Sequence, residues 1–177
     1  MNNRLTTKKI AYISLFAALC YAGTMLNIPF SIAGMKTMIH FGNIFCLVSA
    51  VFLGPIFGGI ASSIGMGLFD ILNGYLVYAP STIILKFFIA FIAGKLYYNT
   101  KQKTTKTLIK AFSLGMLFNV IFSPIVIFIL AKLLGFGEAS SIIATWESLA
   151  TLFNAIIAVI VATLITKKLI ASNIIKD

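Results

Sequence analysis

IAYISLFAALCYAGTML, residues 10–26, is an apolar run without a single charged side chain, and it sets the class of this protein. Three basic residues lie before it, which is also the layout of a signal peptide. The run exceeds the roughly 7–15 apolar residues of a signal-peptide core, and further apolar runs follow. We therefore expect a transmembrane helix over Lys8–Asn27, ended by Ile28-Pro29 because proline disfavours helical geometry in the preceding residue.

The whole chain has the composition of a membrane protein. Of its 177 residues 60% are hydrophobic and 10% are charged, whereas about 25% are charged in a soluble domain. A bilayer core about 30 Å thick needs about 20 apolar residues per helix. The sequence therefore predicts an all-α membrane protein, a compact bundle of six transmembrane helices that forms one domain over residues 1–177.

Glycine and proline punctuation divides the rest of the chain. A short polar loop is expected after the first helix, a tight turn at Gly54-Pro55, and an aromatic loop over residues 73–80. The five further helices are expected at Ile39–Leu53, Ile56–Leu72, Ser81–Tyr98, Leu108–Leu134 and Ile142–Ile165.

Lysine and arginine predict the orientation, because cytoplasmic loops hold the excess of these residues. Six spans with both termini in the cytoplasm leave Lys36 and Lys132 outside and Lys86 within a helix. The net charge of +10 is then mostly an orientation signal, and no nucleic-acid-binding module accompanies it. The inner side receives eleven of the fourteen cations, namely Arg4, Lys8, Lys9, Lys95, Lys101, Lys103, Lys106, Lys110, Lys167, Lys168 and Lys176.

The first helix carries small residues at a spacing of four, Ser14, Ala18 and Ala22. Helices approach one another in a bilayer through such residues. The stripe packs either inside the bundle or against a separate membrane partner.

Polar and aromatic side chains gather toward the outer half of the expected bundle. Ionisable groups within a membrane are costly and suggest a functional site by default. We expect a pocket that opens outward and is closed toward the cytoplasm. An ion pair of Lys86 with Asp70 or Glu147, and aromatic anchors at the interface, are the structural alternatives. The candidate binding residues are Lys86, Trp146, Glu147, Asn154, Asn119, Tyr75, Tyr78, Asp70, His40 and Asn43.

Signatures of catalysis and of an energy source are missing. The chain has no G-x-x-x-x-G-K-[ST] phosphate loop, and its four acids cannot form a proton relay through the membrane. One histidine and two cysteines in apolar runs offer neither a catalytic triad nor a metal site. We expect a protein that is not an enzyme and that needs no cofactor or metal.

Several of these features together resemble the S component of an energy-coupling factor (ECF) vitamin transporter, the substrate-binding membrane subunit. The resemblance covers nearly the whole chain. It rests on size, on the six-helix layout, and on three sequence elements: A-x-x-x-A at Ala18 and Ala22, the run His40-Phe41-Gly42-Asn43, and Gly54-Pro55-Ile56-Phe57-Gly58-Gly59 before a helix that ends near Asp70.

The resemblance implies a multi-pass protein of the bacterial cytoplasmic membrane that binds a vitamin from outside. It also implies that the Ala18 and Ala22 face docks on a membrane coupling subunit carried by two ATPases, with membrane lipid around the rest. Vitamin B6, hydroxymethylpyrimidine or pantothenate is the expected ligand, while riboflavin, folate and a queuosine precursor remain open. A stand-alone secondary transporter or channel is the rival function. Residues at the family's ligand-contact positions would be Lys86, Asn119, Trp146, Glu147, Asn154, Tyr75 and Tyr78.

Overall fold

A computed structural model describes residues 6–174 and contains six helices and one β-hairpin. Arg4 and Lys176, both expected on the inner side, lie outside the described residues. The expected six-helix membrane fold is confirmed, and each helix lies within a few residues of its expected position. The elements in chain order are α1 (Thr7–Met25), β1 (Asn27–Ile32), β2 (Met35–His40), α2 (Gly42–Phe52), α3 (Pro55–Leu72), α4 (Ala79–Asn99), α5 (Thr105–Leu133) and α6 (Ala139–Ala171).

The hairpin replaces the polar loop expected between the first two helices. β1 and β2 pair antiparallel in a register that sets Pro29 opposite Met38. Ala33 and Gly34 both have positive φ, as the two central residues of a type I′ turn require. Pro29 is tolerated because a two-stranded sheet has only edge strands. His40, expected in the first turns of a helix, is instead the last residue of β2, and α2 begins only at Gly42.

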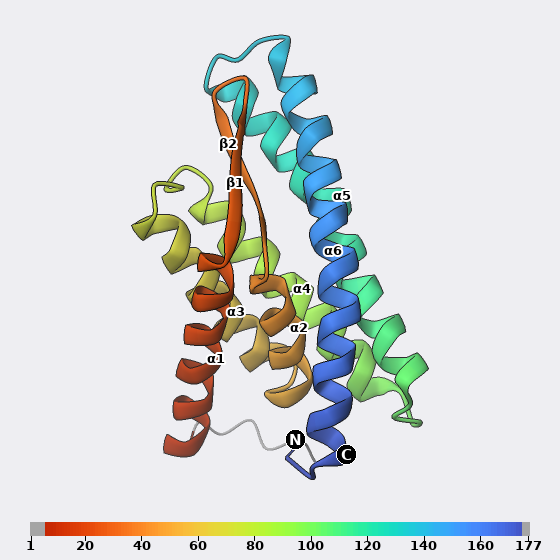
Figure 1. The fold of residues 1–177 in the computed structure, drawn as a ribbon. Coiled ribbons are helices and arrows are strands. Elements are labelled where there is room, and N and C mark those ends of the chain that lie inside the picture. Colours follow the sequence, from red (N-terminus) through yellow and green to blue (C-terminus); the bar gives the residue numbers. More distant parts are fainter. Residues whose placement is uncertain (1–5, 175–177) are drawn as a thin grey trace.

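The two ends of the bundle differ (Figure 1). The hairpin, the α3–α4 loop and the α5–α6 loop lie at one end, which we call the hairpin end. The start of α1, the end of α6 and the α4–α5 connection lie at the other, which we call the terminal end. Four helices, α3, α4, α5 and α6, are long and apolar enough to cross a membrane, and α2 is apolar but only 11 residues long.

Close helix contacts depend on glycine at two points in particular. A Cβ on Gly65 of α3 would lie 2.2 Å from the carbonyl oxygen of Ala17 in α1, and a Cβ on Gly94 of α4 would lie 2.8 Å from the carbonyl oxygen of Ala50 in α2. Both distances are shorter than any real contact of this kind, so only glycine fits. The buried core built from these contacts lies toward the terminal end and includes Leu47, Ala50, Ile89, Phe112 and Met116.

α1 covers the bundle with one face and leaves the other open. Cys20, Gly23 and Thr24 are among its buried residues. The small-residue stripe Ser14, Ala18 and Ala22 is exposed instead. It therefore does not pack inside the bundle.

Candidate binding site

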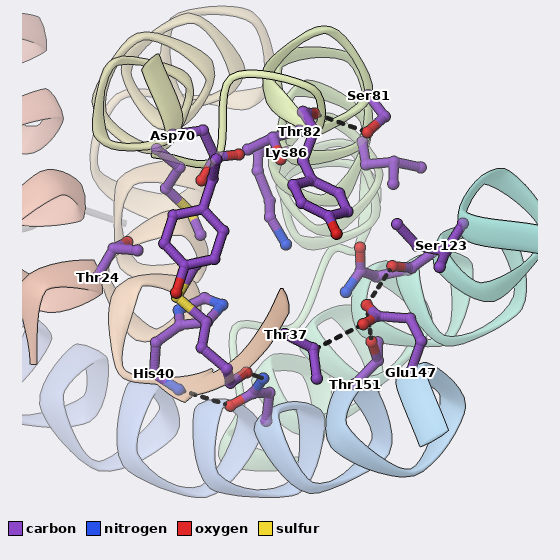
Figure 2. Close-up of a pocket in the computed structure, with 18 of the residues that line it drawn as sticks. Thr24, Thr37, His40, Asp70, Ser81, Thr82, Lys86, Ser123, Glu147 and Thr151 are labelled. Carbon is purple, nitrogen blue, oxygen red and sulfur yellow. Dashed lines mark hydrogen bonds between the residues drawn. The ribbon is translucent and has the colours of Figure 1, made fainter. Parts of the chain in front are cut away.

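A cavity opens among the helices beneath the hairpin (Figure 2). Its empty volume is about 710 Å³ with the open mouth included. Its walls come from β2, the α3–α4 loop and all six helices. The buried core separates it from the terminal end. Nine of the ten candidate residues line it, namely Lys86, Glu147, Asn154, Asn119, Tyr75, Tyr78, Asp70, His40 and Asn43.

Trp146 is the candidate that does not line the cavity. Its side chain is 48% exposed on the outside of α6, although its neighbour Glu147 lines the cavity wall. Successive residues of a helix point about 100° apart, so the two side chains cannot share one face. The structure therefore places Trp146 on the surface that faces lipid.

Glu147 joins three elements around one carboxylate. Its Oε2 accepts a hydrogen bond from the hydroxyl of Thr37 in β2 at 2.8 Å. Its Oε1 accepts from Ser123 of α5 at 2.8 Å and from Thr151 of α6 at 3.0 Å. Figure 2 shows these three hydroxyls converging on the carboxylate. The charge is therefore satisfied by hydroxyl donors rather than by a cation, and the hairpin is tied to α6.

Asn154 forms a second connection between the hairpin and α6. Its Oδ1 accepts from the backbone N–H of His40 at 2.9 Å, and its Nδ2 donates to the carbonyl of Met38 at 3.1 Å. The imidazole Nδ1 of His40 in turn accepts from the backbone N–H of Gly42 at 3.2 Å. Asn154 thus satisfies backbone groups of β2 within the protein, as non-helical backbone in a membrane protein requires.

Three buried polar groups that line the cavity have no partner within residues 6–174. The Lys86 side chain is 8% exposed and makes no hydrogen bond or ion pair there, and its amine points into the open space of Figure 2. Asn43 and Asn119 are 1% and 2% exposed, and Oδ1 of each accepts no hydrogen bond. The structural alternative, an ion pair of Lys86 with Asp70 or Glu147, is not formed within the described residues. Unpaired buried polar groups cost free energy unless a bound molecule satisfies them.

Aromatic rings form the wall of the cavity beside the α3–α4 loop. Tyr75 lies between Phe69 and Tyr78, with ring-centroid separations of 6.0 and 6.2 Å. The Lys36 Nζ of β2 lies 5.5 Å from the centroid of the Tyr75 ring. Burial raises the pKa of both tyrosines. Their hydroxyls are therefore neutral at physiological pH and can donate hydrogen bonds.

The charges that line the cavity balance, with Lys36 and Lys86 against Asp70 and Glu147. Balanced charge, aromatic surface and unpartnered amide and ammonium groups suit a neutral, planar, polar solute.

Sequence reasoning missed several hydroxyl-bearing residues of the cavity. Thr151 follows Glu147 by one helical turn, so the spacing from Glu147 would have found it. Ser123 follows Asn119 by the same step. Thr37 had no signal, because its segment was expected to be a loop. The lining residues outside the candidate set are Thr24, Lys36, Thr37, Met38, Met66, Ser81, Thr82, Leu85, Ser123, Val126, Ile127 and Thr151.

A bundle of membrane helices with a polar, aromatic-walled cavity at one end and a packed core at the other is a membrane-embedded solute-binding protein. The family model of the ECF-type riboflavin transporter S component matches residues 4–171. The chain belongs to this family. It is thus a transport protein rather than an enzyme, a multi-pass protein of the cell membrane, and the resemblance found in the sequence is confirmed.

Structure comparison agrees at the level of the fold. A solved structure of the S component of a bacterial ECF transporter is similar with a TM-score of 0.73, over 96% of this chain and 98% of that chain at 20% sequence identity. No curated protein matches the chain by sequence.

The expected vitamin was wrong. Vitamin B6, hydroxymethylpyrimidine or pantothenate was favoured, whereas the matching family is the riboflavin branch. The near-neutral set of charges pointed to a small polar heterocycle, but charge balance does not distinguish one ring from three fused rings.

Proposed function

We propose that this protein binds riboflavin in the cavity beneath the hairpin and hands it to an ECF module for uptake. The observation that carries the proposal is the match to the riboflavin S-component family over residues 4–171, joined to a cavity with unpartnered polar atoms. Riboflavin combines a planar three-ring system with a chain of hydroxyls and carries no net charge at neutral pH. Such a ligand agrees with the balanced charges and the aromatic wall of the cavity.

The unpartnered groups match the hydrogen-bonding pattern of the flavin. The pyrimidine edge of its ring system presents an N–H between two carbonyl oxygens. Oδ1 of Asn119 or Asn43 can accept from such an N–H, and the Lys86 ammonium can donate to a carbonyl or a ribityl hydroxyl. Tyr75 and Tyr78 offer ring surface for the flavin to pack against.

Flavin fluorescence tests the proposal directly, because the emission of riboflavin changes when the ring system enters a protein. Purified protein should bind riboflavin saturably with one site per chain, and excess pyridoxine or pantothenate should not displace it. Proteoliposomes that contain this chain alone should bind riboflavin without accumulating it. Failure to bind riboflavin, or displacement by the other vitamins at equal concentration, would refute the assignment.

The exposed stripe of α1 is the proposed docking face for the coupling subunit. Ser14, Ala18 and Ala22 are exposed although their residue type favours close helix packing. The cavity would then face outward and the termini the cytoplasm, in line with the lysines near the terminal end. Ala18→Trp should abolish uptake by the complete transporter while riboflavin binding stays unchanged; unchanged uptake would rule out this face.

A further inference from the structure

A groove at the terminal end of the bundle lies far from the cavity. It is formed by the last turns of α4 and the first turns of α5, and its volume is about 640 Å³ with the open side included. In Figure 1 the α4–α5 connection lies at the end opposite the hairpin. Its lining residues are Leu96, Thr100, Lys106, Thr107, Lys110 and Ala111.

The two lysines of the groove share one face of α5, since they are four residues apart. Within residues 6–174 neither ammonium makes a hydrogen bond or an ion pair. Like charges at this spacing repel each other, so an anion between Lys106 and Lys110 would relieve the repulsion. Lys103 differs, because its ammonium donates to the carbonyl of Tyr97 and lies over the rings of Tyr97 and Tyr98.

Carboxylates that could neutralise the groove are absent from this end of the described chain. Residues 6–174 contain three acids. Asp70 and Glu147 line the cavity, and Glu138 precedes α6 at the hairpin end. Within the described residues, therefore, no carboxylate supplies the counter-charge for Lys106 and Lys110.

The surface beside the groove is apolar and continues along the same face of α5. Leu114, Leu117 and Ile121 follow Lys110 at helical spacing, and their side chains are 37%, 49% and 48% exposed. A free phosphate ion would gain nothing from these side chains. A molecule with an anionic head and acyl chains would contact the lysines and the apolar stripe together.

We infer that the α4–α5 groove binds the headgroup of an anionic phospholipid, whose acyl chains lie along Leu114, Leu117 and Ile121. Lys106 and Lys110 hold the phosphate, and the hydroxyls of Thr100 and Thr107 lie within the same groove. Basic pockets between transmembrane helices recognise anionic headgroups by this combination of charge and depth. The site is independent of the riboflavin cavity.

Native mass spectrometry of the protein released from lipid nanodiscs tests the inference. The discs contain phosphatidylglycerol and phosphatidylcholine with identical acyl chains in equal amounts, and the retained lipids are counted. The variant Lys106→Gln/Lys110→Gln is compared with Lys167→Gln/Lys168→Gln, which removes the same charge from exposed positions of α6 at the same end. Riboflavin binding by each variant reports that the bundle is intact.

The wild type should retain phosphatidylglycerol in preference to phosphatidylcholine. Each lysine that holds the headgroup should contribute about 1 kcal/mol, the scale of a basic residue beside an anionic lipid, so the groove variant should hold phosphatidylglycerol about thirtyfold more weakly. The α6 variant should stay within about twofold of wild type. Glycerol phosphate, the same anion without chains, should not displace the lipid at equal concentration.

Three results would overturn the inference. Equal loss of lipid in both variants would mean attraction by overall charge, and displacement by glycerol phosphate would mean a site for a small anion. Unchanged lipid retention in the groove variant, with loss of assembly with the ECF module, would make the groove a protein-docking surface. Should the groove variant fail to bind riboflavin, Lys110→Gln alone replaces it in the comparison.

Discussion

Removal of one hydroxyl from the hairpin should accelerate ligand release. Thr37→Val keeps the branched shape of the side chain but deletes the donor that reaches Glu147 Oε2 at 2.8 Å. β2 lines the cavity, so a ligand inside it lies behind a strand that Thr37 and Asn154 tie to α6. Loss of the Thr37 contact weakens that closure without removing a group from the opposite wall.

The size of the effect follows from the contacts of the carboxylate. A hydrogen bond to a charged group contributes about 1.5–3 kcal/mol. Glu147 keeps Ser123 and Thr151 as donors, so the lower value, about 1.5 kcal/mol, applies. Since about 1.4 kcal/mol corresponds to a factor of ten, riboflavin should dissociate roughly tenfold faster from the variant.

Stopped-flow flavin fluorescence measures the dissociation rate. An excess of a second riboflavin-binding protein traps the released riboflavin so that it cannot rebind. The matched control is Thr145→Val, which removes an exposed hydroxyl of α6 that donates to the carbonyl of Ser141 at 2.8 Å. Thr37→Val should add nothing in a Glu147→Ala background, because its partner is then gone. A dissociation rate equal to that of the control, or full additivity with Glu147→Ala, would refute the proposed closure.

Three further substitutions test other parts of the structure. Lys86→Met should raise the stability of the ligand-free protein by about 1–2 kcal/mol, because it removes a buried ammonium without a partner, and should weaken riboflavin binding at least about tenfold. Thermal unfolding measures the stability and flavin titration measures the affinity. A variant in which stability and affinity both rise or both fall would contradict the assignment. Gly65→Ala should destabilise by about 1–3 kcal/mol, because its Cβ would overlap the Ala17 carbonyl; an unchanged unfolding temperature would count against the α1–α3 contact. Trp146→Ala should leave affinity within about twofold, since its side chain faces outward; a large loss of affinity would place it in the site.

The helices could be predicted from the sequence because long apolar runs and proline-glycine breaks leave few alternatives. The hairpin could not. Its turn is Ala33-Gly34 rather than the usual asparagine-glycine or aspartate-glycine pair, and Pro29 lies inside β1. The pairing gains from β2 packing against α6, which no local pattern reveals. The prediction that His40 lies in a helix was therefore wrong, and the residue ends a strand instead.

The candidate site was predictable wherever a polar residue interrupted an apolar helix, as Asn119 and Lys86 do. Trp146 shows the limit of residue type as a guide. Ile143, Glu147, Thr151 and Asn154 form one face of α6 at helical spacing, and Trp146 lies off that face. The spacing of these residues in the sequence could therefore have shown that Trp146 lies on another face of α6. The identity of the vitamin could not be predicted, because a cavity with balanced charges suits many solutes.

The brevity of α2 has a structural consequence of its own. Eleven residues extend roughly 16 Å, about half of the apolar thickness of a bilayer. The neighbouring α6, with 33 residues, is about 50 Å long and extends past the end of α2. Room for a solute thus arises because α2 ends about halfway across the bilayer and the β-hairpin, which is thinner than a helix, spans the remaining distance. An insertion that lengthened α2 to the full thickness of the bilayer would fill the cavity with the side chains of the added turns. The protein would then be a packed helical bundle without a ligand site.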